Sequence, residues 1–228
     1  MFFRLYPNPQ STDPSGSFPE LPLLLVNTKQ PRRTSEQVAN VRNLLTHYED
    51  ITNSMLDTID KITNEAHNII TDPDFSNHSG SPHIVRLGEL IRINHGILVS
   101  LGVSHPRLER VRELIDHAGI GWTKLTGAGG GGCSITLLKP NIKPAIMKEL
   151  DNKLSSEGFE KYETTLGGAG VGVLWPAVTH SSELGHPVEI SQEMFLTAKG
   201  VEGVESLVGV DSDGKRKWRF WREWTPES

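Results

Sequence analysis

The first half of the chain carries the apolar pattern of a buried strand followed by helices. Residues 21–27 are mostly apolar in one run, which predicts a buried strand. From Thr34 to Asp72 the apolar residues recur at steps of mainly three and four, and this period predicts one long helix. Thr34 and Gln37 have the spacing of a capping box at the start of that helix.

Two further helices are expected before the pattern changes. The first begins at Ser81, with Pro82 as its first helical residue, and ends near Gly102. The second begins within residues 104–107 and ends at Gly119, because glycine suits the left-handed conformation of a helix C-cap.

Beyond residue 119 the period of the apolar pattern falls from near four to near two, which is typical of strands. The expected order is strand, glycine-rich loop, strand, a helix over 143–156, and strands over 162–165 and 171–175. This succession predicts an α+β domain in which helices cover one face of an antiparallel sheet. The glycine loop is expected at an edge of the sheet, where it can face a second domain.

Five glycines occupy the six positions 127–132. Glycine adopts positive φ and leaves the backbone unshielded, so such a loop can direct N–H groups at an anion or let another segment lie against it. Phosphate chemistry is the leading hypothesis, and a hairpin that only turns the chain is the alternative. A dinucleotide-binding loop fits badly, because the strand-like run 133–138 follows where that motif needs a helix. A Walker A loop fails because no Gly-Lys-Ser/Thr follows.

Composition narrows the class of protein. The chain has 228 residues, of which 36% are hydrophobic and 22% are charged, so it can bury one core with an additional segment. A net charge of −5 gives no general attraction to nucleic acid or to an anionic membrane. The single cysteine excludes an internal disulfide, and no run reaches the roughly 18 apolar residues of a membrane span. We expect a cytoplasmic protein, and the nine histidines show no metal-binding spacing.

Residues 29–34, at the expected start of the long helix, are a second candidate for binding chemistry. Arg32 and Arg33 lie beside the free N–H groups of a helix N-terminus, and this combination suits a carboxylate or a phosphate. The alternative is that Thr34 is only the N-cap and that both arginines are solvated.

Residues 215–224 combine basic and aromatic side chains near the C-terminus. Interleaved arginine and tryptophan can stack on bases, contact phosphates or lie at a membrane surface, which would make the chain a non-catalytic binding module. The favoured interpretation is an amphipathic strand whose Trp218, Phe220 and Trp224 pack on the domain while the basic side chains stay in solvent.

Several of these segments resemble one family. Residues 124–133, with the sequence Lys-Leu-Thr-Gly-Ala-Gly-Gly-Gly-Gly-Cys, are similar to the third signature motif of the GHMP kinases, which comprise galactokinase, homoserine kinase, mevalonate kinase and phosphomevalonate kinase. Residues 24–34, 101–105 and 163–171 extend the likeness in the same order. Within the superfamily, the context resembles the C-terminal portion of the mevalonate kinases, and the tail resembles the extended ends of fungal members.

The resemblance implies a ferredoxin-like GHMP kinase C-terminal domain over residues 21–178, preceded by an irregular segment (1–20) and followed by an extension (179–228). It implies ATP-dependent phosphorylation of mevalonate to 5-phosphomevalonate in isoprenoid and sterol biosynthesis. Mevalonate and ATP are the expected small-molecule partners, and a homodimer is an open alternative. Another GHMP kinase, such as phosphomevalonate kinase, is the alternative activity. No nucleic acid or membrane partner is expected.

Matching positions assign residues to that activity. Arg32 and Thr34 would bind on the mevalonate side of the cleft, although Arg33 departs from the smaller polar residue expected between them. The family's N-terminal loop Pro-x-x-x-Gly-Leu-x-Ser-Ser-Ala has no match in this chain, so the Mg²⁺ ligands and the catalytic Asp are expected in an N-terminal half outside it. We therefore expect no catalytic residue here and little or no activity of the chain alone. The loop expected to close over the ATP phosphates comprises Thr126, Gly127, Ala128, Gly129, Gly130, Gly131 and Gly132.

Overall fold

The computed structural model describes six stretches of the chain, namely residues 19–78, 81–167, 172–174, 177–179, 188–208 and 218–220. The expected irregular segment 1–20 lies almost wholly outside them. Contacts divide the chain into two compact units, with the division between residues 168 and 169. Among the described residues, no helix combines the length and the apolar character of a membrane span.

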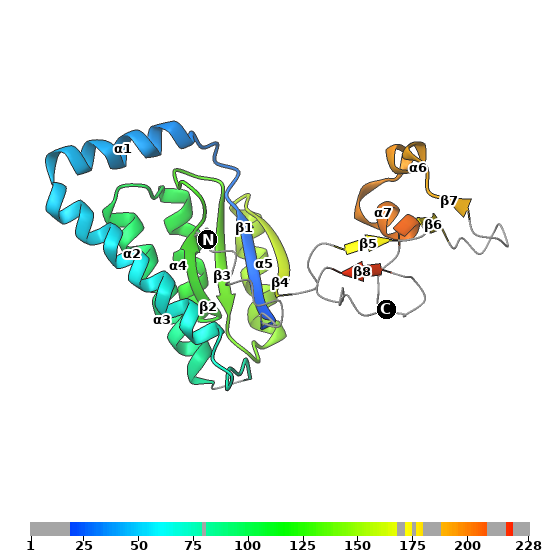
Figure 1. The fold of residues 1–228 in the computed structure, drawn as a ribbon, viewed down its shortest axis with the longest axis horizontal. Helices are drawn as coiled ribbons and strands as arrows, with labels where there is room; N and C mark the ends of the chain where they lie inside the picture. The colour runs from blue at the N-terminus through cyan, green and yellow to red at the C-terminus, as the bar shows by residue number, and fades with distance from the viewer. Residues whose placement is uncertain are drawn as a thin grey trace, which may run out of the picture. The chain divides into compact units, whose positions relative to one another are not determined.

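The first unit is an α+β domain built on a four-stranded sheet. Its strands lie in the order β2-β3-β1-β4, and every neighbouring pair is antiparallel, which is the ferredoxin-like arrangement expected. Helices α1 to α4 form the connection from β1 back to β2 (Figure 1). The elements are β1 (Leu21–Asn27), α1 (Thr34–His47), α2 (Glu49–Ile70), α3 (Pro82–Ser100), α4 (Pro106–Ala118), β2 (Gly121–Leu125), β3 (Cys133–Leu138), α5 (Pro144–Ser156) and β4 (Glu160–Leu166).

The central strand β1 buries both of its faces. Leu24 lies opposite Thr136 of β3 and Glu163 of β4, and it packs with Val26 against α4 and α5. Leu21 and Leu23 point to the other face, where they pack with apolar residues of α2 and α3. Helices therefore cover both faces of the sheet rather than the single face expected from the sequence. The continuous apolar run of β1 is the signal of a strand that is buried on both sides.

The long helix expected from residue 34 is two helices. The break lies at Tyr48, whose φ of −137° and ψ of 58° are not helical, and Figure 1 shows the bend between α1 and α2. No proline or glycine lies at this site, and the apolar residues keep the same spacing on both sides of it. The sequence pattern therefore did not indicate the break. The capping box is also wrong. Arg33 is the N-cap of α1 without a side-chain cap, and Thr34 is the first helical residue.

The other helices follow the sequence pattern closely. Pro82 begins α3, as expected. Gly119 ends α4 with a φ of 68°, which confirms the predicted C-cap. At the start of α4 the N-cap is His105, whose side chain accepts a hydrogen bond from the backbone N–H of Arg107.

The described residues of the second unit form two small antiparallel sheets and two helices. Residues 218–220 of the basic-aromatic tail form a strand, β8, which agrees with the strand interpretation, and the rest of the tail lies outside the described residues. The strand expected over 171–175 is β5. The elements are β5 (Gly172–Leu174) paired with β8 (Trp218–Phe220), β6 (Val178–Thr179) paired with β7 (Val188–Glu189), α6 (Gln192–Thr197) and α7 (Gly200–Val208).

Candidate functional site: the glycine loop

The glycine loop, residues 126–132, connects β2 to β3 at the edge of the sheet. Gly127, Gly129, Gly130 and Gly132 all have φ between 67° and 79°, a conformation that side chains rarely adopt. Close neighbours add a second requirement for glycine. A Cβ added at Gly129 would lie 1.9 Å from the carbonyl oxygen of Val103.

Two short segments hold the loop in place. The N–H of Gly130 donates to the Val103 carbonyl at 2.8 Å, and the N–H of Gly132 donates to the Gln30 carbonyl at 3.0 Å. The carbonyl of Gly132 in turn accepts from the backbone N–H and the hydroxyl of Thr28, at 2.9 and 2.7 Å. Within the described parts of the chain, the N–H groups of residues 127, 128, 129 and 131 have no such partner. The loop is thus fixed at two points and keeps backbone donors for a ligand.

The guanidinium group of Arg32 lies against this loop. Its Nη1 donates to the Thr126 carbonyl at 3.5 Å, and it is the nearest neighbour of the positions where side chains on Gly127 and Gly132 would begin. Arg33 instead pairs with Glu36 at 3.0 Å. A fixed positive charge beside free backbone N–H groups favours an anion.

Gln37 brings the first turn of α1, which begins at Thr34, to the same place. Thr34 is exposed, and its hydroxyl has no hydrogen-bond partner among the described residues. The side-chain amide of Gln37 lies against Gly130, where an added Cβ would meet its Nε2 at 2.6 Å. The sequence indicated Arg32 and the loop as separate candidates, and the structure places them in contact. Gln37 is a further neighbour of the loop, although the sequence pattern had suggested that it caps the helix.

A groove of about 660 Å³ runs alongside the loop. Gly127 and Ala128 form one part of its wall, and side chains of α1, α2 and the end of α3 form the rest. Space for a ligand thus adjoins the free donors of the loop. The apolar lining residues are Val38, Val41, Leu45, Leu56, Ile59, Leu98, Leu101 and Val103.

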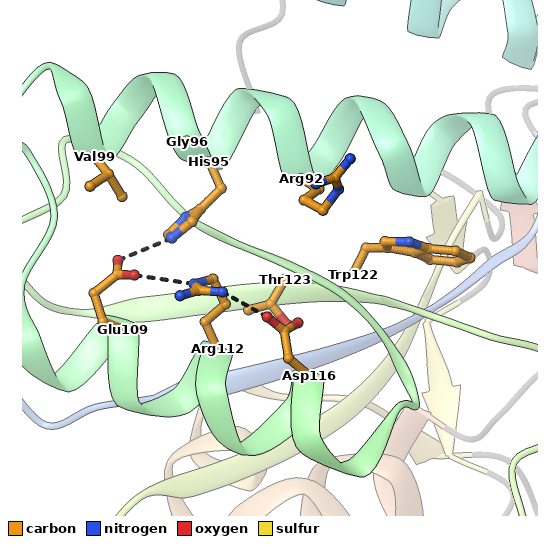
Figure 2. Close-up of a pocket in the computed structure, with 9 residues that line it drawn as sticks. All are labelled: Arg92, His95, Gly96, Val99, Glu109, Arg112, Asp116, Trp122 and Thr123. Carbon is orange, nitrogen blue, oxygen red and sulfur yellow. Dashed lines mark hydrogen bonds and ion pairs between the residues drawn. The ribbon is translucent and has the colours of Figure 1, made fainter.

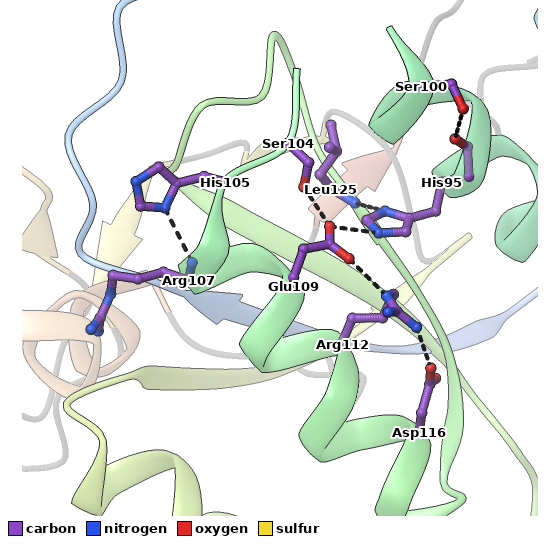
Figure 3. Close-up of polar contacts among 10 residues, drawn as sticks. His95, Ser100, Ser104, His105, Arg107, Glu109, Arg112, Asp116 and Leu125 are labelled. Carbon is purple, nitrogen blue, oxygen red and sulfur yellow. Dashed lines mark hydrogen bonds and ion pairs between the residues drawn. The ribbon is translucent and has the colours of Figure 1, made fainter. Parts of the chain in front are cut away.

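A buried polar network lies behind the loop, and the sequence analysis did not identify it. His95 on α3 is only 5% exposed, and its Nδ1 accepts a hydrogen bond from the backbone N–H of Leu125 at 3.3 Å. Its Nε2 lies 3.0 Å from a carboxylate oxygen of Glu109 on α4. Glu109 also accepts hydrogen bonds from the Ser104 hydroxyl and from Nε of Arg112 (Figure 3). The only sequence signal is that residue 95 lies on the buried face of its helix.

The charges of this network follow from burial and hydrogen bonding. Burial lowers the pKa of His95 below its ordinary value of 6.5, and this effect outweighs the opposing attraction of Glu109. Burial alone would raise the pKa of Glu109, but hydrogen bonds from Ser104 and Arg112 lower it. His95 is therefore neutral at pH 7. Because its Nδ1 accepts from Leu125, the proton lies on Nε2 and is donated to the Glu109 carboxylate.

A second cavity, of about 500 Å³, lies between α3, α4 and the outer edge of β2 (Figure 2). His95 and Glu109 line it together with Arg112, whose Nη1 pairs with Asp116 at 2.7 Å. Its ionic side chains thus largely neutralise one another. Among the described residues, no group of three or more His, Cys, Asp or Glu side chains is placed to hold a metal ion.

Comparison with known proteins places this domain in a family. Residues 80–156 match the family described as "GHMP kinases C terminal". The chain is 54% identical to the mevalonate kinase of Gibberella zeae over 223 residues, which are 95% of the chain and 44% of that protein. It is 56% identical to the mevalonate kinase of Aspergillus fumigatus over 220 residues, 95% of the chain and 40% of that protein. The chain thus spans less than half the length of these relatives.

Solved structures share the fold. The crystal structure of L. major mevalonate kinase in complex with R-mevalonate superposes with a TM-score of 0.54. That match covers 65% of this chain and 43% of the other, at 21% sequence identity, so it bears on the fold alone. The sequence match to the C-terminal family, the identity to fungal relatives and the shared fold agree. The chain belongs to the GHMP kinase family and corresponds to the C-terminal portion of its mevalonate kinase members.

Proposed function

We propose that this chain forms the C-terminal part of an ATP-dependent mevalonate kinase, which phosphorylates mevalonate to 5-phosphomevalonate. The observation that carries the proposal is the identity of 54% and 56% to two mevalonate kinases across 95% of the chain. The geometry of the glycine loop supports it, because free N–H groups and Arg32 form a surface suited to phosphate.

The chain's own contribution is positioning and charge stabilisation. ATP supplies the transferred phosphoryl group, and such transfer depends mainly on orientation and on electrostatic stabilisation of the phosphate oxygens. The free N–H groups of the loop donate to those oxygens as their negative charge develops. The adjoining groove offers apolar walls to a ligand bound beside the loop.

Arg32 and Thr34 are proposed to bind the mevalonate side of the cleft. Arg32 can pair with a carboxylate, and the exposed Thr34 at the start of α1 can hydrogen-bond to a carboxylate or a hydroxyl. The residues described here do not fit a Mg²⁺ site, so no step runs through a metal ion on this chain. We place the Mg²⁺ ligands in the N-terminal half of the family. The proposal also includes a cytoplasmic location and a role in sterol biosynthesis.

The test is an assay of mevalonate phosphorylation with the full chain, alone and mixed with the N-terminal half of the Gibberella zeae relative. We expect ATP-dependent 5-phosphomevalonate in the mixture. Arg32→Ala should lower the rate about 100-fold, whereas Arg33→Ala, which removes an exposed pair with Glu36, should change it little. A mixture that phosphorylates only phosphomevalonate would assign the alternative activity. No product from either substrate would reject a kinase function for this pairing.

A further inference from the structure

The N–H of Leu125 points away from the sheet at the residue that precedes the glycine loop. β2 is an edge strand, and among the described strands it pairs with β3 alone. Thr126 donates to the Cys133 carbonyl, so in the alternating pattern of an antiparallel pair the N–H of the preceding residue faces outward. The outward N–H of an edge strand normally meets water. Here it meets the buried Nδ1 of His95 at 3.3 Å.

Glu109 connects this contact to the far side of the loop. One of its carboxylate oxygens accepts from Nε2 of His95 and from the Ser104 hydroxyl. Ser104 directly follows Val103, and the Val103 carbonyl receives the N–H of Gly130. Figure 3 shows Glu109 between Ser104 and His95, the side chain that contacts Leu125. A single carboxylate therefore ties together the supports of Leu125, just before the loop, and of Gly130, within it.

We propose that His95 and Glu109 are positioning residues, which hold the glycine loop in the conformation that presents its free N–H groups. The inference rests on the proposed function for its catalytic consequence, but the holding of the loop does not depend on it. His95 orients the strand that leads into the loop, and Glu109 orients both His95 and the turn that carries the Val103 carbonyl. Neither side chain contacts the substrate in this role.

The physical reason is that five glycines leave the loop with a large conformational entropy in the absence of supports. A donor site for phosphate is effective only when its N–H groups are oriented before the charge develops. Buried hydrogen bonds supply that orientation, because a buried group that loses its partner is left unsatisfied instead of turning to solvent. His95 is only 5% exposed, so its hydrogen bonds are buried ones of this kind.

Two substitutions at residue 95 separate the two contacts. In His95→Asn the side-chain oxygen lies near the position of Nδ1 and can still accept from Leu125. In His95→Gln the amide reaches the position of Nε2 and can still contact Glu109, but it leaves Leu125 without an acceptor. Glu109→Ala removes the carboxylate that connects the two supports. Glu113→Gln is the control on the same helix, since Glu113 is 66% exposed and pairs with Arg110.

The first measurement is amide hydrogen exchange by NMR on the full 228-residue chain. The Leu125 amide should exchange about tenfold faster in His95→Gln and close to the wild-type rate in His95→Asn. Glu109→Ala should accelerate both Leu125 and Gly130, and Glu113→Gln should accelerate neither. The amide of Val111, in the core of α4, is the reference for overall stability and should keep its rate. Unchanged Leu125 exchange in His95→Gln, or equal acceleration at Val111, would overturn the proposal.

The second measurement uses the assembled kinase from the mixing assay. A displaced loop should lower kcat about tenfold in His95→Gln while KM for mevalonate stays nearly constant, because the loop acts on the reacting phosphate rather than on mevalonate. His95→Asn should restore most of kcat. Faster Leu125 exchange with an unchanged kcat would overturn the catalytic consequence. If the wild-type mixture makes no product, the proposed function fails, and the exchange data still decide whether this network holds the loop.

Discussion

Gly129 is the position of the glycine loop where an added side chain meets the closest obstacle. Its φ is +79°, and its Cβ would lie 1.9 Å from the Val103 carbonyl oxygen. Gly102 has a similar φ of +72°, but nothing lies within 4 Å of its added Cβ. Positive φ costs alanine about 1–2 kcal/mol, so Gly102→Ala should lower the free energy of unfolding by that amount. Gly129→Ala should lower it further, by at least about 1 kcal/mol.

Urea unfolding of the two variants measures this difference. The pair shares the backbone strain, so any excess in Gly129→Ala reports the clash with Val103. Equal losses would mean that the loop moves away from Val103 without cost. In the mixing assay Gly129→Ala should lose activity and Gly102→Ala should keep it.

His95 makes stability depend on pH near neutrality. Its folded pKa is lowered from 6.5, so the unfolded chain binds the proton more readily and acidification favours unfolding. The stabilisation is complete above the unfolded pKa and is lost as the pH falls through 6.5 towards the folded pKa. Glu109, Arg112 and Lys124 are the charged groups that act on the ring, and burial is the largest effect.

The free energy of unfolding should therefore depend more steeply on pH in the wild type than in a variant without His95. Between about pH 7.5 and about pH 5.5, the free energy of unfolding of the wild type should fall more than that of His95→Asn, which cannot take up a proton. Urea unfolding at several pH values across this range measures both slopes. Other histidines contribute equally to the two proteins, so parallel slopes would contradict a lowered pKa at His95.

At the scale of elements, the contact between α3 and β2 depends on one glycine. A Cβ at Gly88 would lie 2.1 Å from the ring of Trp122, whereas a Cβ at Gly96 on the same helix has open space. Gly96→Ala should stabilise the chain by up to about 1 kcal/mol, because alanine is the better helix former. Gly88→Ala should destabilise it, because α3 or the ring must move. Thermal unfolding of both variants measures whether their midpoints shift in opposite directions. A higher midpoint in both variants would mean that the Trp122 ring does not lie against Gly88.

The sequence predicted most elements but not their interruptions or their supports. Apolar spacing located α3 and α4, because their buried faces repeat with the period of a helix, whereas β1 was located by its continuous apolar run. It did not locate the break at Tyr48, where a change of backbone angles leaves the apolar stripe intact. The glycines of the loop could be read directly from the sequence. Their supports, His95, Glu109 and the Val103 carbonyl, come from separate elements, and no local pattern brings them together.

At the scale of the whole molecule, the order of the strands lies beyond any local pattern. Periodicity identifies a strand but not its neighbours, and the ferredoxin-like order came from the resemblance to GHMP kinases rather than from spacing. The sequence did not predict that helices also cover the second face of the sheet. The apolar stripe of α2 and α3 would look the same whichever face of the sheet these helices pack on. The domain boundary expected at 178/179 stays a prediction.

The division of the chain into two units predicts that the first one folds alone. All three apolar clusters of the described core come from residues 21–166. A fragment of residues 1–168 should therefore unfold in one cooperative transition, with a midpoint close to that of the corresponding transition in the full chain. Thermal unfolding followed by circular dichroism tests this. A fragment without a cooperative transition would show that residues 169–228 are required for the core.

The central position of β1 has a consequence for the chain as the ribosome makes it. Leu21 pairs with Leu166 and Asn27 pairs with Cys133, so both neighbours of β1 are synthesised long after it. At about 5–20 residues per second, roughly 5–30 s separate β1 from its partners. Throughout that interval the run Leu-Leu-Leu-Val has two unpaired edges. The strand at the centre of the finished sheet is therefore, during translation, an exposed and aggregation-prone segment that a chaperone would protect by covering it.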